Sequence, residues 1–173
     1  MKRANTNLQK SAFGFSLIEL LIVVAIIMVI AAIAVPNFLR SRSIANESAA
    51  VQAMRSVDTA ELTYSTSFGT GFAPLINLGG ATPCTSTSTT ACILDELLSS
   101  GARSGYSIKT LAPGSLGTMA APNVTYSVNA MPQTPGSTGV RSFCSDQTGV
   151  IRFDAAGGTP PNPCDSTGLP NIQ

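Results

Sequence analysis

The sequence predicts an α+β fold, with a long N-terminal α-helix that spans a membrane in its first half and packs on a small antiparallel β-sheet in its second. Three observations lead to this fold. An apolar run extends from Leu20 to Val35, a one-sided apolar pattern follows over residues 43–68, and short alternating segments separated by turn residues come after it. A helix followed by a run of strands is the order expected of an α+β domain.

The apolar run has the length of a membrane span. From Phe15 to Val35 the only charged residue is Glu19. At about 1.5 Å of rise per residue, a helix over residues 15–35 spans roughly 30 Å, which is the hydrocarbon thickness of a bilayer. A helix of a soluble domain is rarely apolar on every face for so long. We therefore predict that residues 15–35 cross a membrane.

The residues before this segment are basic. Residues 1–14 carry Lys2, Arg3 and Lys10 and no acid, which predicts a cytoplasmic N-terminus and an exported C-terminal part. An ordinary secretory signal and a plain membrane anchor are alternatives, because both can have a basic start before an apolar core. Neither alternative accounts for Glu19. An acid near the centre of a bilayer costs about 2.5–3.5 kcal/mol and usually meets a partner there.

The string Gly14-Phe15-Ser16-Leu17-Ile18-Glu19 resembles the prepilin cleavage and methylation motif of type IV pilins and type II secretion pseudopilins. The resemblance is strong over residues 1–66 and only architectural beyond them. It implies that a prepilin peptidase and methyltransferase cuts between Gly14 and Phe15 and methylates the new N-terminal Phe15. It further implies two kinds of partner, an inner-membrane assembly platform and other copies of the same chain.

The resemblance also implies an assembly role for Glu19. Cleavage leaves Phe15 with a positive amine in apolar surroundings, and the Glu19 carboxylate of a neighbouring subunit neutralises it. Because an unpaired buried charge is costly and a paired one much less so, the pair sets register rather than adding much net stability. The alternative is a carboxyl that is simply protonated in the membrane.

Pro36 lies just past the apolar run. Pilins of this family bear a proline here, where the helix bends or melts as subunits pack. The alternative is a simple break between a membrane anchor and a domain, since a proline inside a helix removes one hydrogen bond and clashes with the preceding turn.

Residues 36–68 are predicted to continue the helix with one apolar face that a sheet must cover. The apolar residues recur at spacings of three and four and are Ala50, Ala53, Met54, Val57, Ala60, Tyr64 and Phe68. The polar residues Glu47, Gln52, Arg55 and Glu61 are expected to fall largely on other faces.

An exported head domain, residues 69–173, is predicted to hold the sheet. Residues 69–92 look loop-like and residues 93–100 suit a short helix. Strands are expected at residues 106–111, 124–130, 142–145 and 150–153, with a hairpin turn at 146–149. They give a sheet of three or four strands.

Four cysteines, Cys84, Cys92, Cys144 and Cys164, all lie in the predicted head. An even number in an exported domain indicates two disulfides, and four cysteines permit three connectivities. Nearness in sequence favours Cys84 with Cys92 and Cys144 with Cys164. A terminal loop stapled back to the sheet resembles the C-terminal disulfide loop of many type IV pilins.

The composition argues against catalysis, metal binding and nucleic-acid binding. The absence of histidine removes the commonest general base and metal ligand. A net charge of +1 provides no basic surface for nucleic acid. Asp146, Asp154 and Asp165 are near loops but lack a regular calcium-ligand spacing. We expect no enzyme activity, no cofactor and no metal.

The resemblance therefore implies a structural subunit of a type IV pilus, which serves adhesion, twitching motility or DNA uptake. Such a subunit lies in the inner membrane before assembly and in a cell-surface pilus afterwards. The alternatives are a minor pilin, a type II secretion pseudopilin in a periplasmic pseudopilus, and a membrane-anchored exported enzyme. The chain length and the stapled tail favour the pilus subunit.

Overall fold

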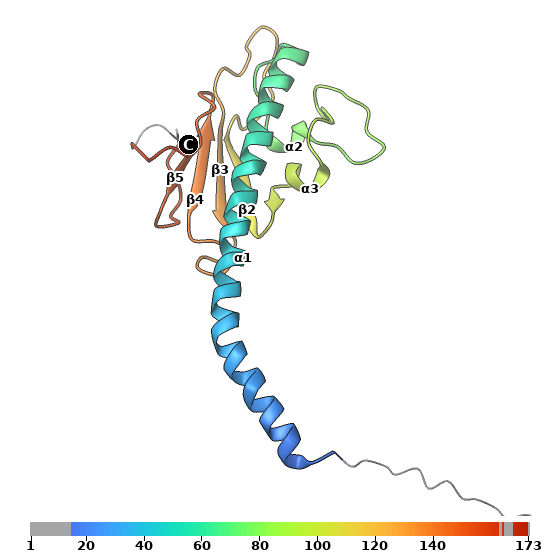
Figure 1. The fold of residues 1–173 in the computed structure, drawn as a ribbon. Helices are drawn as coiled ribbons and strands as arrows, with labels where there is room; N and C mark the ends of the chain where they lie inside the picture. Colours follow the sequence, from blue (N-terminus) through green and yellow to red (C-terminus); the bar gives the residue numbers. More distant parts are fainter. Residues whose placement is uncertain (1–14, 163, 165–167, 173) are drawn as a thin grey trace, which may run out of the picture. The chain divides into compact units, whose positions relative to one another are not determined.

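The structure is a computed structural model that describes residues 15–162, 164 and 168–172. The chain divides into two compact units, with the boundary between Phe38 and Leu39. Helix α1 (Leu17–Phe68) contributes to both units, and the second unit, called the head domain here, also holds every other element (Figure 1). The predicted leader, residues 1–14, and Gly14 within it, lie outside the described residues.

The first unit consists of apolar helix. Its large apolar side chains, from Phe15 to Phe38, are 40 to 79% exposed. The most apolar 18-residue window of α1 has a mean hydropathy of 3.2 and no buried residue, so the helix is long and apolar enough to cross a membrane. The helix continues through Pro36, so it does not break there. Just beyond the proline, the side-chain amide of Asn37 donates a hydrogen bond to the Ile33 carbonyl at 3.1 Å.

In the head domain, α1 buries one face against the sheet (Figure 1). Ala50, Met54 and Val57 are fully buried on the helix side. Val128 and Phe143 are fully buried on the sheet side. The spacing of three and four residues lines these helix positions into a single stripe, which is why the sequence pattern predicts the contact face.

The sheet has five antiparallel strands in the order β1-β2-β3-β4-β5, so the predicted α+β fold is confirmed. The strands are β1 (Ala102–Arg103), β2 (Tyr106–Ala112), β3 (Ser127–Pro132), β4 (Ser142–Asp146) and β5 (Arg152–Asp154). Three or four strands were expected. The additional strand is β1, a two-residue segment that pairs with the start of β2 across a tight turn.

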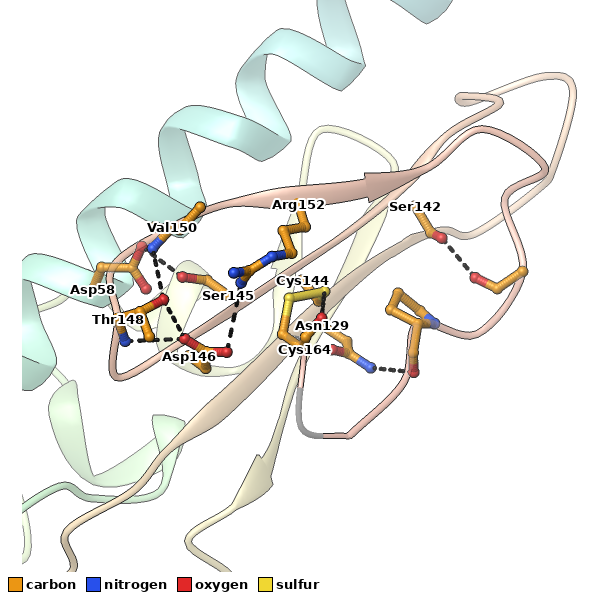
Figure 2. The surroundings of a disulfide bond; sticks show 12 residues. Asp58, Asn129, Ser142, Cys144, Ser145, Asp146, Thr148, Val150, Arg152 and Cys164 are labelled. Atoms are coloured by element: carbon orange, nitrogen blue, oxygen red, sulfur yellow. Dashed lines mark hydrogen bonds and ion pairs between the residues drawn. A yellow bond between two sulfur atoms is a disulfide. The ribbon is translucent and has the colours of Figure 1, made fainter. Parts of the chain in front are cut away.

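The far face of the sheet is covered by the C-terminal tail, as Figure 2 shows. A disulfide joins Cys144 of β4 to Cys164, with Cα atoms 5.7 Å apart. The Ser142 hydroxyl donates to the Gly158 carbonyl at 2.6 Å, and the Asn129 side-chain amide donates to the Pro160 carbonyl at 3.2 Å. All of β4 is buried, because α1 covers one of its faces and the tail the other.

Several local boundaries differ from the sequence expectation, among them β5, which was expected at residues 150–153 and begins at Arg152. The loop-like stretch 69–92 contains helix α2 (Leu75–Leu78), and the short helix predicted at 93–100 is α3 (Glu96–Ser99). The Asp95 side chain caps α3 by accepting a hydrogen bond from the Leu98 N–H at 2.8 Å, which sets its start. The strand expected from residue 124 begins at Ser127, because the backbone of Asn123 instead pairs with Gly71, just after α1.

The tail contacts generate a first prediction. Replacing both Cys144 and Cys164 by alanine should lower the free energy of unfolding by about 3 kcal/mol, since the disulfide closes a loop of this size in the unfolded chain. Urea unfolding of the full chain in detergent measures this loss. The tail should also become sensitive to protease while the helix–sheet core stays resistant. An unchanged urea midpoint and an uncut tail would show that the other tail contacts hold the tail on the sheet without the disulfide.

Candidate functional site

Residues 15–35, called the assembly segment here, carry Phe15 and Glu19 of the predicted processing and assembly residues; Pro36 follows directly, and Gly14 lies outside the described residues. The Ser16 carbonyl accepts the first helical hydrogen bond, from the Leu20 N–H at 3.2 Å. Glu19 therefore lies in the first turn of α1, where the helix dipole favours a negative charge. Phe15, just ahead of the helix, is 71% exposed.

Glu19 forms no ion pair within the described part of the chain. Between Phe15 and Phe38 the sequence contains no lysine or arginine that could reach it. Within the described residues, Glu19 therefore has no cationic partner from this segment of the helix. Glu19 and Pro36 belong to the first unit, and the four cysteines belong to the head domain.

A second set of acids lies on the head-domain part of α1. The sequence pattern did not identify these acids as a group. This acidic row is Glu47, Asp58 and Glu61. The expectation that Glu47 and Glu61 fall on other faces than the apolar stripe is wrong, because they are only 5% and 0% exposed. Their positions follow the stripe by steps of three or four, Glu47 to Ala50 and Val57 to Glu61, so spacing alone could have found them.

Glu47 binds the connection between β3 and β4. Its carboxylate accepts hydrogen bonds from the Val140 and Arg141 N–H groups at 2.8 and 3.2 Å, and from the Arg141 guanidinium at 2.8 Å. Burial by itself raises the pKa of Glu47, but the hydrogen bonds from Val140 and Arg141 outweigh it and leave the pKa lowered. Glu47 is thus an ionised anchor between helix and sheet.

Asp58 receives two neutral donors from the sheet side. The Tyr126 hydroxyl donates to it at 2.8 Å. The Ser145 hydroxyl donates to it at 2.9 Å (Figure 2). Burial raises the pKa of Asp58, the two hydrogen bonds oppose this rise, and the nearby Asp146 carboxylate adds to it. These bonds join the middle of α1 to the sheet.

Glu61 is the least satisfied of the three acids. One carboxyl oxygen accepts a hydrogen bond from the Ala73 N–H at 3.0 Å, and the other has no hydrogen-bond partner among the described residues. Burial raises the pKa of Glu61 to about 7, the Ala73 bond opposes the rise, and the charge of Asp58 one turn earlier adds to it. Glu61 therefore changes its charge near neutral pH.

The acids near the loops do not form a metal site where they are described. Asp146 accepts hydrogen bonds from the Thr148 N–H and hydroxyl at 2.9 and 2.6 Å and lies 3.7 Å from the Arg152 guanidinium (Figure 2). Asp154 accepts a hydrogen bond from the Ala156 N–H. Asp165 lies outside the described residues. No group of three or more metal-ligating side chains is found in the described ranges.

Glu61 gives a prediction on pH dependence. Because its pKa is higher in the folded chain than in the unfolded one, the folded state binds more protons between about pH 4.5 and 7, and stability falls as pH rises through that window. The isosteric substitution Glu61→Gln should remove this loss. Its stabilisation over wild type should be about 3 kcal/mol larger at pH 8 than at pH 4.5.

Urea unfolding of the full chain in detergent at both pH values measures this difference. The matched control is Glu96→Gln, which removes an exposed acid at the start of α3, away from the helix–sheet contact. A Glu61→Gln effect that does not grow with pH would show that Glu61 is not buried in its neutral form.

Comparison with known proteins bears on the N-terminal part of the chain. Residues 9–35 match a prokaryotic N-terminal methylation motif. No curated protein and no solved structure matches the chain. The motif implies processing by a prepilin peptidase and assembly into pilin-type polymers, and it contains the assembly segment described above. This match supports a prepilin of the type IV pilin or pseudopilin type.

Proposed function

We propose that the chain is cut between Gly14 and Phe15, methylated on Phe15, and polymerised through the assembly segment into a type IV pilus filament. The observation that carries this proposal is that apolar side chains are exposed around the whole circumference of the assembly segment, whose only charged residue is Glu19. Apolar side chains exposed on every face need a bilayer or other helices around them. A membrane supplies the first surroundings, and other copies of the chain supply the second.

Glu19 directs the transfer between these surroundings. The processed N-terminus carries a positive amine, and Glu19 has no cationic partner in the described chain. Both charges are costly in an apolar environment when they are alone and much less so as a pair. A subunit is therefore retained in the filament where its amine meets a neighbour's Glu19, which selects one axial register among many otherwise similar apolar contacts.

The head domain supports this role by staying folded outside the cell. One disulfide, Cys84–Cys92, closes a small loop, and the other, Cys144–Cys164, joins the tail to β4. Covalent links of this kind persist in oxidising compartments. We place the processed chain first in the inner membrane and then at the cell surface, where the filament serves adhesion, twitching motility or DNA uptake.

The proposal predicts that Glu19→Ala separates processing from polymerisation. The variant should reach the membrane and lose its leader, because the cleavage junction is intact, but sheared filaments should fall at least about tenfold, since one desolvated charge has lost its partner. Mass spectrometry of the membrane form checks cleavage and methylation, and immunoblots of sheared filaments check yield. Glu96→Ala is the control for losing an acid. Wild-type filament yield from Glu19→Ala would refute the assembly role.

A second prediction separates a pilus from a pseudopilus, since the same assembly segment serves both. Electron microscopy of sheared surface fibres, labelled with antibody against the head domain, should show the chain along the length of the fibres. Labelling only at the tips would instead indicate a minor pilin. Fibres free of label, with the chain retained in the cell envelope, would favour the type II secretion pseudopilin.

A further inference from the structure

A pocket of about 300 Å³ lies in the head domain between α1 and two turns of the sheet. On the helix side it is lined by Leu39, Arg42 and Asn46. These residues are three and four positions apart, so they share one face of α1. The pocket therefore lies beside the first turns of α1 that belong to the head domain.

The other wall of the pocket consists of two turns that offer polar groups. Ser104 and Gly105 form the turn between β1 and β2, with φ angles of 47° and 76°. Ser137 and Thr138 belong to the connection between β3 and β4, which is tied to the helix because the Asn46 amide donates to the Thr138 carbonyl at 2.9 Å. The Ser104 and Ser137 hydroxyls form no hydrogen bond with the described residues, so both can donate to a ligand.

The charge of the pocket comes from Arg42, its only charged lining residue. Arg42 is exposed and makes no ion pair within the described ranges. The next acid along α1 is Glu47, which is already bound by the Arg141 guanidinium at 2.8 Å. An unpaired guanidinium beside free hydroxyl donors is suited to a phosphate group, whose oxygens accept several charge-assisted hydrogen bonds.

We propose that this pocket binds the phosphate of a phospholipid headgroup while the chain waits in the membrane. Arg42 follows Val35, the end of the apolar segment, by seven residues of the same helix, a rise of about 10 Å. The headgroup layer extends about 5–8 Å beyond the hydrocarbon, and an arginine side chain spans the remainder. Lysine and arginine near a span normally favour the cytoplasmic side, so orientation does not explain an arginine on the exported side.

The proposal rests on the membrane stage of the proposed function but not on the formation of a pilus. The bound headgroup holds the head domain against the membrane surface before assembly. Filament formation then removes the chain from its lipids and vacates the pocket. Glu19→Ala should leave lipid binding unchanged, so failure of filament assembly and failure of lipid binding are separate results.

Lipid titration of the full chain in maltoside micelles, which contain no phosphate, tests the proposal. Dihexanoyl phosphatidylglycerol is added, and amide NMR signals of Ser104 and Ser137 are followed. Both signals should shift and saturate in wild type. In Arg42→Gln, half-saturation should need at least about tenfold more lipid, because one charge-assisted contact is lost. Arg40→Gln is the matched control, since Arg40 carries the same charge two residues away but does not line the pocket.

Inorganic phosphate, added in a parallel titration, distinguishes the source of the phosphate group. Weaker shifts of the same signals than with lipid support a headgroup site. Shifts with inorganic phosphate that are as large as or larger than those with lipid would overturn the lipid as ligand. Equal losses in Arg40→Gln and Arg42→Gln would show general attraction of charge to the micelle surface and overturn the pocket. Unshifted signals, with filament loss confined to Arg42→Gln, would assign Arg42 to a neighbouring subunit instead.

Discussion

Helix α1 must satisfy two different surroundings with one continuous backbone, and the other features of the molecule follow from this constraint. Its first part leaves apolar side chains bare on every side, whereas its remainder buries one stripe beneath a sheet. No element of the head can cover a helix apolar all round, because a sheet covers only one face. The first part therefore needs a bilayer or other apolar helices around it, and it lies within the N-terminal methylation motif matched at residues 9–35.

The head-domain part of α1 is joined to the sheet by charge as well as by apolar contact. Glu47 reaches Arg141, 94 positions later, and Asp58 reaches Tyr126 and Ser145. Such contacts are directional, so they add a preferred register to the non-directional burial of the apolar stripe. Glu61 differs from both, since one of its oxygens lacks a hydrogen bond in the described structure and its neutral form is favoured up to near-neutral pH.

Disulfides and hydrogen bonds hold those parts of the head domain that contribute little to the apolar core. The tail crosses the far face of β3 and β4 through Cys164 and through hydrogen bonds from Asn129 and Ser142. The loop between Cys84 and Cys92 lies near α1, because the Tyr64 hydroxyl donates to the Ser88 carbonyl at 2.6 Å. Both segments are rich in small polar residues, whose burial alone contributes little.

The sequence by itself determined the long helix, its apolar first part and its lone acid, because these are properties of neighbouring residues: composition, a period of 3.6 and a local motif. It also placed most strands, through alternation. Tertiary structure alone decided that Glu47 binds Arg141 and that Asn123 pairs with Gly71, so that β3 begins later than the alternation predicts. It also decided that Arg42 lines a pocket with Ser104 and Ser137. These pairings join residues far apart in the chain, and no local pattern encodes which distant partner a polar group meets once the chain has closed.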